Sequence, residues 1–248
     1  MKTKLALIIA ATLVSTGAFA KGGNYGYHGG YNPYYAEDNY AEVTLTDSLG
    51  TTAKIEQTST AGGSTAVIEA FDADRSSFQI YQYTDNNFAV IKTLDGAHDY
   101  LKDKVIIEQT GSDNKTAVVM SGGTDKADVH LVTTGDENKA LVELVQANGS
   151  EVIGDVTGEL NEANIKIAYG DKNKVDFTQD GYDNDLDVSI LDGDGNKVYV
   201  NQTSDKAFAE VYVKWSDNNV ITVNQTYGDV AKVTTVGGGS NIVTVNQY

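Results

Sequence analysis

Apolar and polar residues alternate along most of this chain, so that every second residue of many short segments is apolar. A period of two predicts β-strands that bury one face, whereas a helix repeats its apolar residues roughly every three to four positions. The pattern recurs at a step of 23 residues, because the frames that begin at Asn173, Asn196 and Asn219 each read Asn-x-apolar-x-apolar-x-Gln. A fixed step of this length predicts stacked repeats, each made of two short strands joined by turns.

The repeats can be placed on the chain from Asn39 to Tyr248, which predicts an all-β solenoid of nine coils. The extra residues between Asn87 and Asp103 fall in a turn, where a solenoid tolerates insertions. We expect the first strands of the coils to begin at Asn39, Ser64, Asn87, Asn114, Asn138, Asn161, Asn184, Ala207 and Asp229. We expect the second strands to begin at Thr51, Ser76, Asp103, Asp125, Ser150, Asn173, Asn196, Asn219 and Asn241.

Glutamine stands six residues after most of the second-strand starts, in phase with the inward apolar residues. A buried amide is unfavourable unless its hydrogen-bonding groups are satisfied, and stacked glutamines can satisfy one another along the solenoid axis. The alternative is that these residues lie at the surface just beyond each strand. Leu131 and Val156 take this position in the fourth and fifth coils. The expected glutamine ladder consists of Gln57, Gln82, Gln109, Gln179, Gln202, Gln225 and Gln247.

Asparagine begins many of the strands, which leaves two interpretations open. The side chains either form a second ladder or cap the turns, a position that asparagine commonly occupies. The residues concerned are Asn39, Asn87, Asn114, Asn138, Asn161, Asn173, Asn184, Asn196, Asn219 and Asn241.

Asp171, Asp194 and Asp217 repeat at the same 23-residue step and are expected to form a column in one turn. Carboxylates at that separation repel one another. The column therefore acts either as a gatekeeper that slows self-association or as a site for a bridging cation. The segment Asp192 to Thr203 opens like a calcium-binding EF-hand loop but lacks the glycine and the glutamate of that motif.

The chain carries a formal charge of −17, with 18 Lys and Arg against 35 Asp and Glu, and it has no cysteine. Such a balance excludes nucleic acid as a partner, because phosphate binding requires clusters of basic residues. His28, His98 and His130 are scattered, and no nucleophile, metal-binding or phosphate-binding motif stands out. We expect no enzyme activity, cofactor or metal. A polysaccharide-acting β-helix protein is the enzymatic alternative, although Arg75 is the sole arginine.

Three regions are expected along the chain. Residues 1–20 have the basic start, the short apolar run and the small-residue site of a secretory signal peptide, with cleavage after Ala20. Residues 21–38 are rich in Gly and Tyr and form either a plain flexible tail or an address for an export apparatus. Residues 39–248 form the solenoid. The protein is therefore expected to be secreted and extracellular, and not to span a membrane.

The frame Ser76-Ser-Phe-Gln-Ile-Tyr-Gln82-Tyr83, followed by Asn87-Phe-Ala89, resembles the curlin repeat of bacterial curli subunits. The ending Val245-Asn-Gln-Tyr248 is similar to the C-terminus of that family, and the Gly-rich segment is similar to its secretion address. The resemblance implies a subunit that leaves through an outer-membrane secretion pore and polymerises into extracellular amyloid fibres of a biofilm matrix. It also implies a curli-type nucleator and a periplasmic chaperone as partners. Whether the chain is the bulk subunit or the nucleator stays open.

The ends of the repeat array give a separate reason to expect fibres. The alternation runs to within one residue of Tyr248, and the first coil follows the Gly/Tyr-rich segment, so we expect both ends of the solenoid to be uncapped. Each end should accept another copy in the geometry of the next coil, and such head-to-tail contacts yield filaments. The alternative is a soluble secreted adhesin that stays monomeric.

Overall fold

The computed structural model describes residues 12–15, 39–45, 50–59, 62–70, 75–93, 103–121, 126–145, 148–168 and 171–248. Within these ranges the chain is all β, and it contains no helix long and apolar enough to cross a membrane. The β-solenoid predicted from the 23-residue step is confirmed. His28, His98 and Asp125, and the Gly/Tyr-rich segment 21–38, lie outside the described residues.

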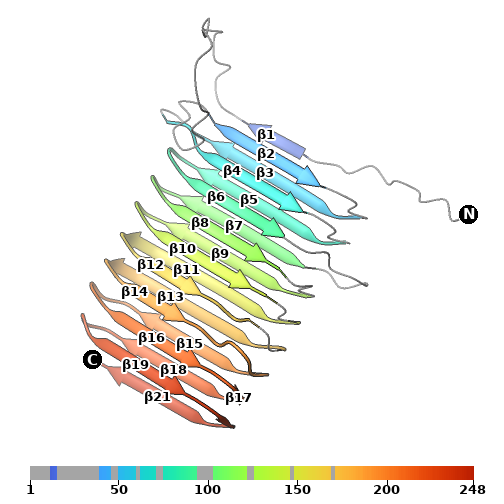
Figure 1. Cartoon of the computed structure of the whole chain (residues 1–248). Helices are drawn as coiled ribbons and strands as arrows, with labels where there is room; N and C mark the ends of the chain where they lie inside the picture. Colours follow the sequence, from blue (N-terminus) through green and yellow to red (C-terminus); the bar gives the residue numbers. More distant parts are fainter. Residues whose placement is uncertain are drawn as a thin grey trace, which may run out of the picture.

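Two parallel sheets form opposite walls of the solenoid, and the chain passes from one to the other within every coil (Figure 1). Among the described residues, sheet B has nine strands: β2 (Tyr40–Leu45), β4 (Thr65–Ala70), β6 (Phe88–Thr93), β8 (Lys115–Met120), β10 (Lys139–Leu144), β12 (Glu162–Ile165), β14 (Asp185–Val188), β16 (Phe208–Val213) and β19 (Val230–Thr235). Sheet A has ten strands in the part of the chain that the structure describes: β1 (Thr12–Ser15), β3 (Thr52–Thr58), β5 (Ser77–Tyr83), β7 (Lys104–Thr110), β9 (Asp128–Thr134), β11 (Glu151–Glu159), β13 (Lys174–Tyr182), β15 (Lys197–Gln202), β18 (Val220–Gln225) and β21 (Ile242–Gln247). A small third pair joins β17 (Ser216–Asp217) to β20 (Gly238–Gly239).

The core lies between the two sheets and is built from rows of equivalent residues in register. In sheet A, Ile80 pairs with Ile55 on one side and with Ile107 on the other, and all three are buried. In sheet B, Ile68 pairs with Ile91 in the same way. Branched side chains suit this pleated, closely spaced arrangement, and full burial of each contributes roughly 1.5–3 kcal/mol.

One inward row contains a glycine, Gly154, and a side chain of the adjacent strand fills the volume that a side chain at this position would occupy. Gly154 of β11 pairs with Leu131 of β9 and lies beside Phe177 of β13. A Cβ atom at Gly154 would lie 2.6 Å from Leu131 Cδ2 and 2.7 Å from Phe177 Cζ. The buried ring of Phe177 therefore occupies the volume that a side chain at Gly154 would take.

The predicted start of the fourth second strand is wrong by two residues. Ala127, and not Asp125, takes the position of Asp103, because Lys104 N–H donates to Ala127 O at 2.8 Å. The residue aligned with Gln109 is therefore Thr133 and not Leu131. A shift of two residues keeps every side chain on the same face of the sheet, so the alternation of the sequence fits both frames equally well.

Strand β1 lies within the segment predicted to be a signal peptide, and it pairs with β3 from Thr12 opposite Lys54 to Ser15 opposite Gln57. Cleavage after Ala20 would remove β1. It would leave β3 as the outermost strand of sheet A at this end of the described solenoid.

Candidate functional site

Buried glutamines link successive coils along one side of the core. Gln57 Nε2 donates to Gln82 Oε1 at 2.8 Å, and Gln82 Nε2 donates to Gln109 Oε1 at 2.8 Å. Gln179, Gln202, Gln225 and Gln247 form a second run, in which each Nε2 donates to the next Oε1 at 3.1 Å. The amides thus bond along the solenoid axis, and every bond in both runs points from the N-terminal coil to the C-terminal coil.

Each glutamine of the ladder also joins the two sheets. The second N–H of Gln202 donates to Asp185 O at 3.0 Å, and that of Gln179 donates to Glu162 O at 2.9 Å. Both acceptors lie 17 residues before the glutamine, on the sheet B strand of the same coil. Because Nε2 is satisfied along the axis and across the core, the amide group is tolerated at full burial.

The glutamine ladder is interrupted in the middle of the solenoid. Gln109 donates to Thr116 Oγ1 at 3.0 Å, and the next two positions of the row are Thr133 and Val156. Two buried polar atoms beside this gap, Thr133 Oγ1 and Gln179 Oε1, have no hydrogen-bond partner among the described residues. The stacking is therefore least complete between the fourth and sixth coils.

Asparagines at the strand starts form two columns, one on each side of the solenoid. Their Oδ1 atoms accept hydrogen bonds from the backbone N–H of the equivalent residue in the next coil, for example from Asn114 to Asn87 at 3.0 Å. The sheet B column runs through Asn39, Asn87, Asn114, Asn138, Asn161 and Asn184. The sheet A column runs through Asn173, Asn196, Asn219 and Asn241.

The asparagine amides also satisfy the turns. Asn138 Nδ2 donates to Gly158 O at 2.8 Å, and Asn161 Nδ2 donates to Gly181 O at 3.0 Å. Gly158 has φ +107°, a left-handed conformation that favours glycine. The asparagines of the sheet B column therefore stack between coils and also bind the turn backbone, so both interpretations of the sequence describe part of their role.

Ser64, Ser76 and Asp103 continue these columns, because each offers an acceptor oxygen although it is not asparagine. Asn87 N–H donates to Ser64 Oγ at 3.1 Å, Asp103 N–H donates to Ser76 Oγ at 3.2 Å, and Ala127 N–H donates to Asp103 Oδ1 at 2.9 Å. Their position in the repeat frame was the signal that could have identified them. The expected ladder contained only asparagines and therefore left these three residues out. Any short side chain with an acceptor oxygen can reach this N–H.

The aspartate column is held by backbone hydrogen bonds. Asp171 N–H donates to Asp194 Oδ1 at 2.8 Å, and Asp194 N–H donates to Asp217 Oδ1 at 2.9 Å. At these two positions an exposed carboxylate oxygen of the next coil, and not a backbone carbonyl, accepts the hydrogen bond from the backbone N–H. Asn196, the fifth residue of the loop that resembles an EF-hand, is buried and bonded into the sheet A column, so it does not face Asp194 as a ligand.

Two carboxyl groups on the outer face of β14 have altered acidities. Burial raises the pKa of Asp185, and the nearby carboxylates of Glu162, Asp187 and Asp183 raise it further. Burial also raises the pKa of Asp187, and Glu210 adds to the effect. Among the described residues no group of three His, Cys, Asp or Glu side chains is arranged to hold a metal ion. His130 points outward from β9 and is exposed.

The edge strands at the C-terminal end of the stack expose apolar residues. In the described part of the chain, β19 is the last strand of sheet B and β21 is the last strand of sheet A. Ile242 is 79% exposed, and Val243 and Val245 are only partly buried against the core. Ile221 and Val223, the equivalents of Val243 and Val245 in the preceding coil, are fully buried because the next coil covers them.

Comparison with protein-family models, with curated proteins and with solved structures found no match for this chain. The ladders and the edge strands are therefore the features from which a function can be inferred.

Proposed function

We propose that this protein is a structural subunit of extracellular curli-type amyloid fibres, which joins end to end with copies of itself. The observation that carries the proposal is the one-way glutamine ladder, which reaches β21 with the same geometry that it has between interior coils. A copy stacked on β21 continues this pattern, with Gln247 donating to Gln57 of the next copy. The repeated hydrogen bonds and the buried amide ladder are characteristic of cross-β assemblies.

The register of the end-to-end contact follows from the register within the chain. Placing β3 of a second copy on β21 sets Val245 opposite Ile55 and continues the inward apolar row. Placing β2 on β19 sets Lys232 opposite Glu42, which are of opposite charge. The open strand edges and half-covered apolar side chains make this contact favourable, and because it does not close it produces a filament.

The charge of the C-terminal coils favours the same contact. Residues 207–248 contain three acidic residues and two lysines, so they carry a net charge of −1 against −17 for the whole chain. Electrostatic repulsion at this end is therefore small. At the other end, the contact requires β3 to be free of β1, so the proposal includes removal of the signal peptide after Ala20.

Fibre formation by the Lys21–Tyr248 chain tests the proposal. We expect amyloid-dye binding, acceleration by preformed fibre seeds, and diffraction at about 4.7–4.8 Å along the fibre and about 10 Å across it. Chains that stay as soluble single molecules at high concentration and mildly acidic pH would disprove end-to-end assembly. Export, a nucleator, a secretion pore and a chaperone belong to the same proposal through the resemblance to curlin repeats.

A sharper test blocks only the outer edge. Val220 N–H donates to Asn241 O and Thr226 N–H donates to Gln247 O, so the odd-numbered residues of β21 bond to β18. The backbone of Thr244 therefore faces the open edge. Thr244→Pro removes an N–H that is needed only by an incoming copy, and proline is tolerated at such edge positions. The folded monomer should persist while elongation from this end stops. Thr244→Val is the matched control and should elongate normally.

A further inference from the structure

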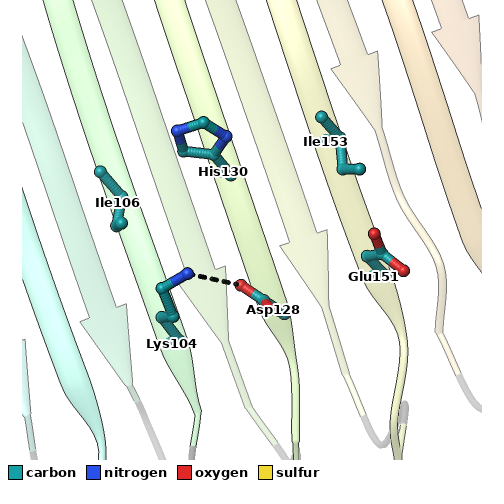
Figure 2. A pocket seen from close by; sticks show the side chains of 6 residues that line it. All are labelled: Lys104, Ile106, Asp128, His130, Glu151 and Ile153. Carbon is teal, nitrogen blue, oxygen red and sulfur yellow. Dashed lines mark ion pairs between the residues drawn. The ribbon is translucent and has the colours of Figure 1, made fainter.

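A shallow hollow lies on the outer face of sheet A, over β7, β9 and β11. Figure 2 shows Ile106, His130 and Ile153 in one row across the three strands, with Lys104, Asp128 and Glu151 in the row beside it. The strand register places the members of each row directly opposite one another. The hollow is thus an apolar row, with a histidine at its centre, that is bordered by charged residues.

The border of this hollow is acidic. The outward residues of the three strands include Lys104 together with five carboxylates, so with neutral His130 their formal charges sum to −4. Lys104 lies 3.7 Å from Asp128, and Lys174 of the next strand lies 3.3 Å from Glu151. The five carboxylates are Glu108, Asp128, Glu151, Asp155 and Glu159.

The same three coils present a different surface on the opposite wall. On the outer face of sheet B, Val90, Ala117 and Leu141 form an apolar row across β6, β8 and β10. Leu141 is 42% exposed and is one of the large hydrophobic side chains that the solenoid leaves at its surface. Phe88 and Val119 flank the row on either side.

This second surface is positively charged within a strongly acidic protein. The outward residues of β6, β8 and β10 include Lys92, Lys115 and Lys139 against the single carboxylate of Glu143, a formal charge of +2. Ion pairs to neighbouring strands, such as Lys139 to Glu162 at 3.4 Å, are exposed. Exposed pairs of this kind are weak, so these side chains can take new partners.

We propose that the outer face of sheet A over β7, β9 and β11 docks side by side against the outer face of sheet B over β6, β8 and β10 of a second copy of this chain. Both surfaces have an apolar central row with members one coil apart, so the rows match in spacing. Their charges are opposite, at −4 and +2, and in the docked pair the exposed Leu141 would enter the hollow around His130. Charge complementarity around an apolar centre is typical of specific association.

The two surfaces are different, so the contact is heterologous. Each copy that uses its sheet A face keeps its sheet B face free, and lateral contacts therefore propagate into rows of molecules. Because both surfaces lie on the walls of the solenoid and not at its ends, the docking is independent of the end-to-end contact of the proposed function. In a fibre it would align neighbouring filaments, because each filament repeats the two faces once per molecule.

Cysteine cross-linking tests this contact directly, because the chain contains no cysteine of its own. One variant carries His130→Cys and the other carries Ala117→Cys, at the centres of the two apolar rows. Mixed under mild oxidation, they should form disulfide-linked heterodimers, seen on non-reducing gels and identified by mass spectrometry. The control mixture pairs His130→Cys with Asp187→Cys, an exposed position on β14 of sheet B that lies outside the row and away from the end-to-end contact. We expect at least about tenfold more heterodimer in the first mixture, because docking raises the effective concentration of the two thiols.

Several results would overturn the proposal. Heterodimer yields equal to the control show that the faces do not meet, and disulfides confined to pairs of the same variant show an isologous contact instead. Adding Leu141→Glu to the Ala117→Cys chain places a negative charge in the sheet B row, opposite the acidic hollow, and an unchanged yield would exclude that row. Electron microscopy of the same samples separates the two proposals. Filaments without heterodimers refute only the lateral contact, and heterodimers without filaments refute only the end-to-end contact.

Discussion

Gln202 donates a hydrogen bond from Nε2 to Oε1 of Gln225 at 3.1 Å, and both side chains are fully buried. The two residues occupy equivalent positions on β15 and β18, so this bond joins one coil to the next. A buried polar contact of this kind contributes modestly when it is intact, but it becomes strongly unfavourable when one partner is lost.

Gln202→Leu should lower the free energy of unfolding by about 2–3 kcal/mol, because one N–H of one neighbouring glutamine and the amide oxygen of the other lose their hydrogen bonds in the core. The groups concerned are Nε2 of Gln179 and Oε1 of Gln225. Denaturant unfolding of the soluble monomer measures the change. Asn201→Leu, at the adjacent outward position, is the matched control and should change stability by less than about 0.5 kcal/mol. Equal effects of the two variants would show that the ladder is not a source of stability.

Val156→Gln should repair the gap in the glutamine ladder and stabilise the protein by about 1 kcal/mol, the usual net contribution of a hydrogen bond. In this register the new Nε2 can donate to Gln179 Oε1, and the new Oε1 can accept from Thr133 Oγ1, two buried atoms without partners among the described residues. Thermal unfolding measures the effect.

Val156→Glu is the control for Val156→Gln, since glutamate has nearly the same shape as glutamine but offers no amide donor. It should destabilise the protein, because a carboxylate at this position is buried without a compensating charge. If both variants lower the melting temperature equally, the loss of the valine dominates and the proposed repair fails.

Gly154→Ala should destabilise the solenoid by about 1–3 kcal/mol, the range found for overpacked cores. The added methyl group would meet Leu131 and the ring of Phe177 at distances below 3.0 Å. Phe177→Leu alone should also be destabilising, because it leaves unfilled space. The double variant should be more stable than the sum of the two single effects predicts, since the smaller side chain makes room for the methyl group. Simple additivity in a double-mutant cycle would contradict this packing relationship.

Asp185→Asn should stabilise the protein at neutral pH. The pKa of Asp185 is raised in the folded state by burial and by Glu162, Asp187 and Asp183. Between its ordinary pKa and the raised value the folded state binds more protons than the unfolded state, so stability falls as pH rises through that window. Above the window the charged carboxylate opposes folding. The amide removes this penalty.

The gain from Asp185→Asn should therefore be present at pH 7 and disappear below about pH 3, where the carboxyl group is protonated in both states. Melting temperatures measured across this range check the prediction. Asp128→Asn, which removes the exposed ion pair with Lys104, is the control and should have a small effect of the opposite sign at pH 7. A constant gain from Asp185→Asn at all pH values would mean that its charge is not the cause.

The inward position of the glutamines could be predicted because Gln179, Gln202 and Gln225 keep the phase of the apolar residues in an unbroken frame. The hydrogen-bond partners of the asparagines could not. Asn114 binds a backbone N–H of the next coil and a glycine carbonyl, and both partners are set by how the turns stack. Likewise the sequence showed three aspartates in a column, but only the fold placed the Oδ1 of Asp194 on the backbone of Asp171.

The sequence by itself determined the solenoid, its 23-residue step and the inward or outward direction of nearly every strand residue, because a period of two within a longer fixed period leaves one way to bury the apolar rows. Only the tertiary structure decided that Ala127, and not Asp125, continues the column below Asp103. It also decided that the acidic patch over β7, β9 and β11 of sheet A and the basic patch over β6, β8 and β10 of sheet B lie on opposite walls of the same three coils. The physical reason is that a shift of two residues preserves the pattern of faces, so the register at an irregular turn depends on hydrogen bonds between coils that are distant in the sequence.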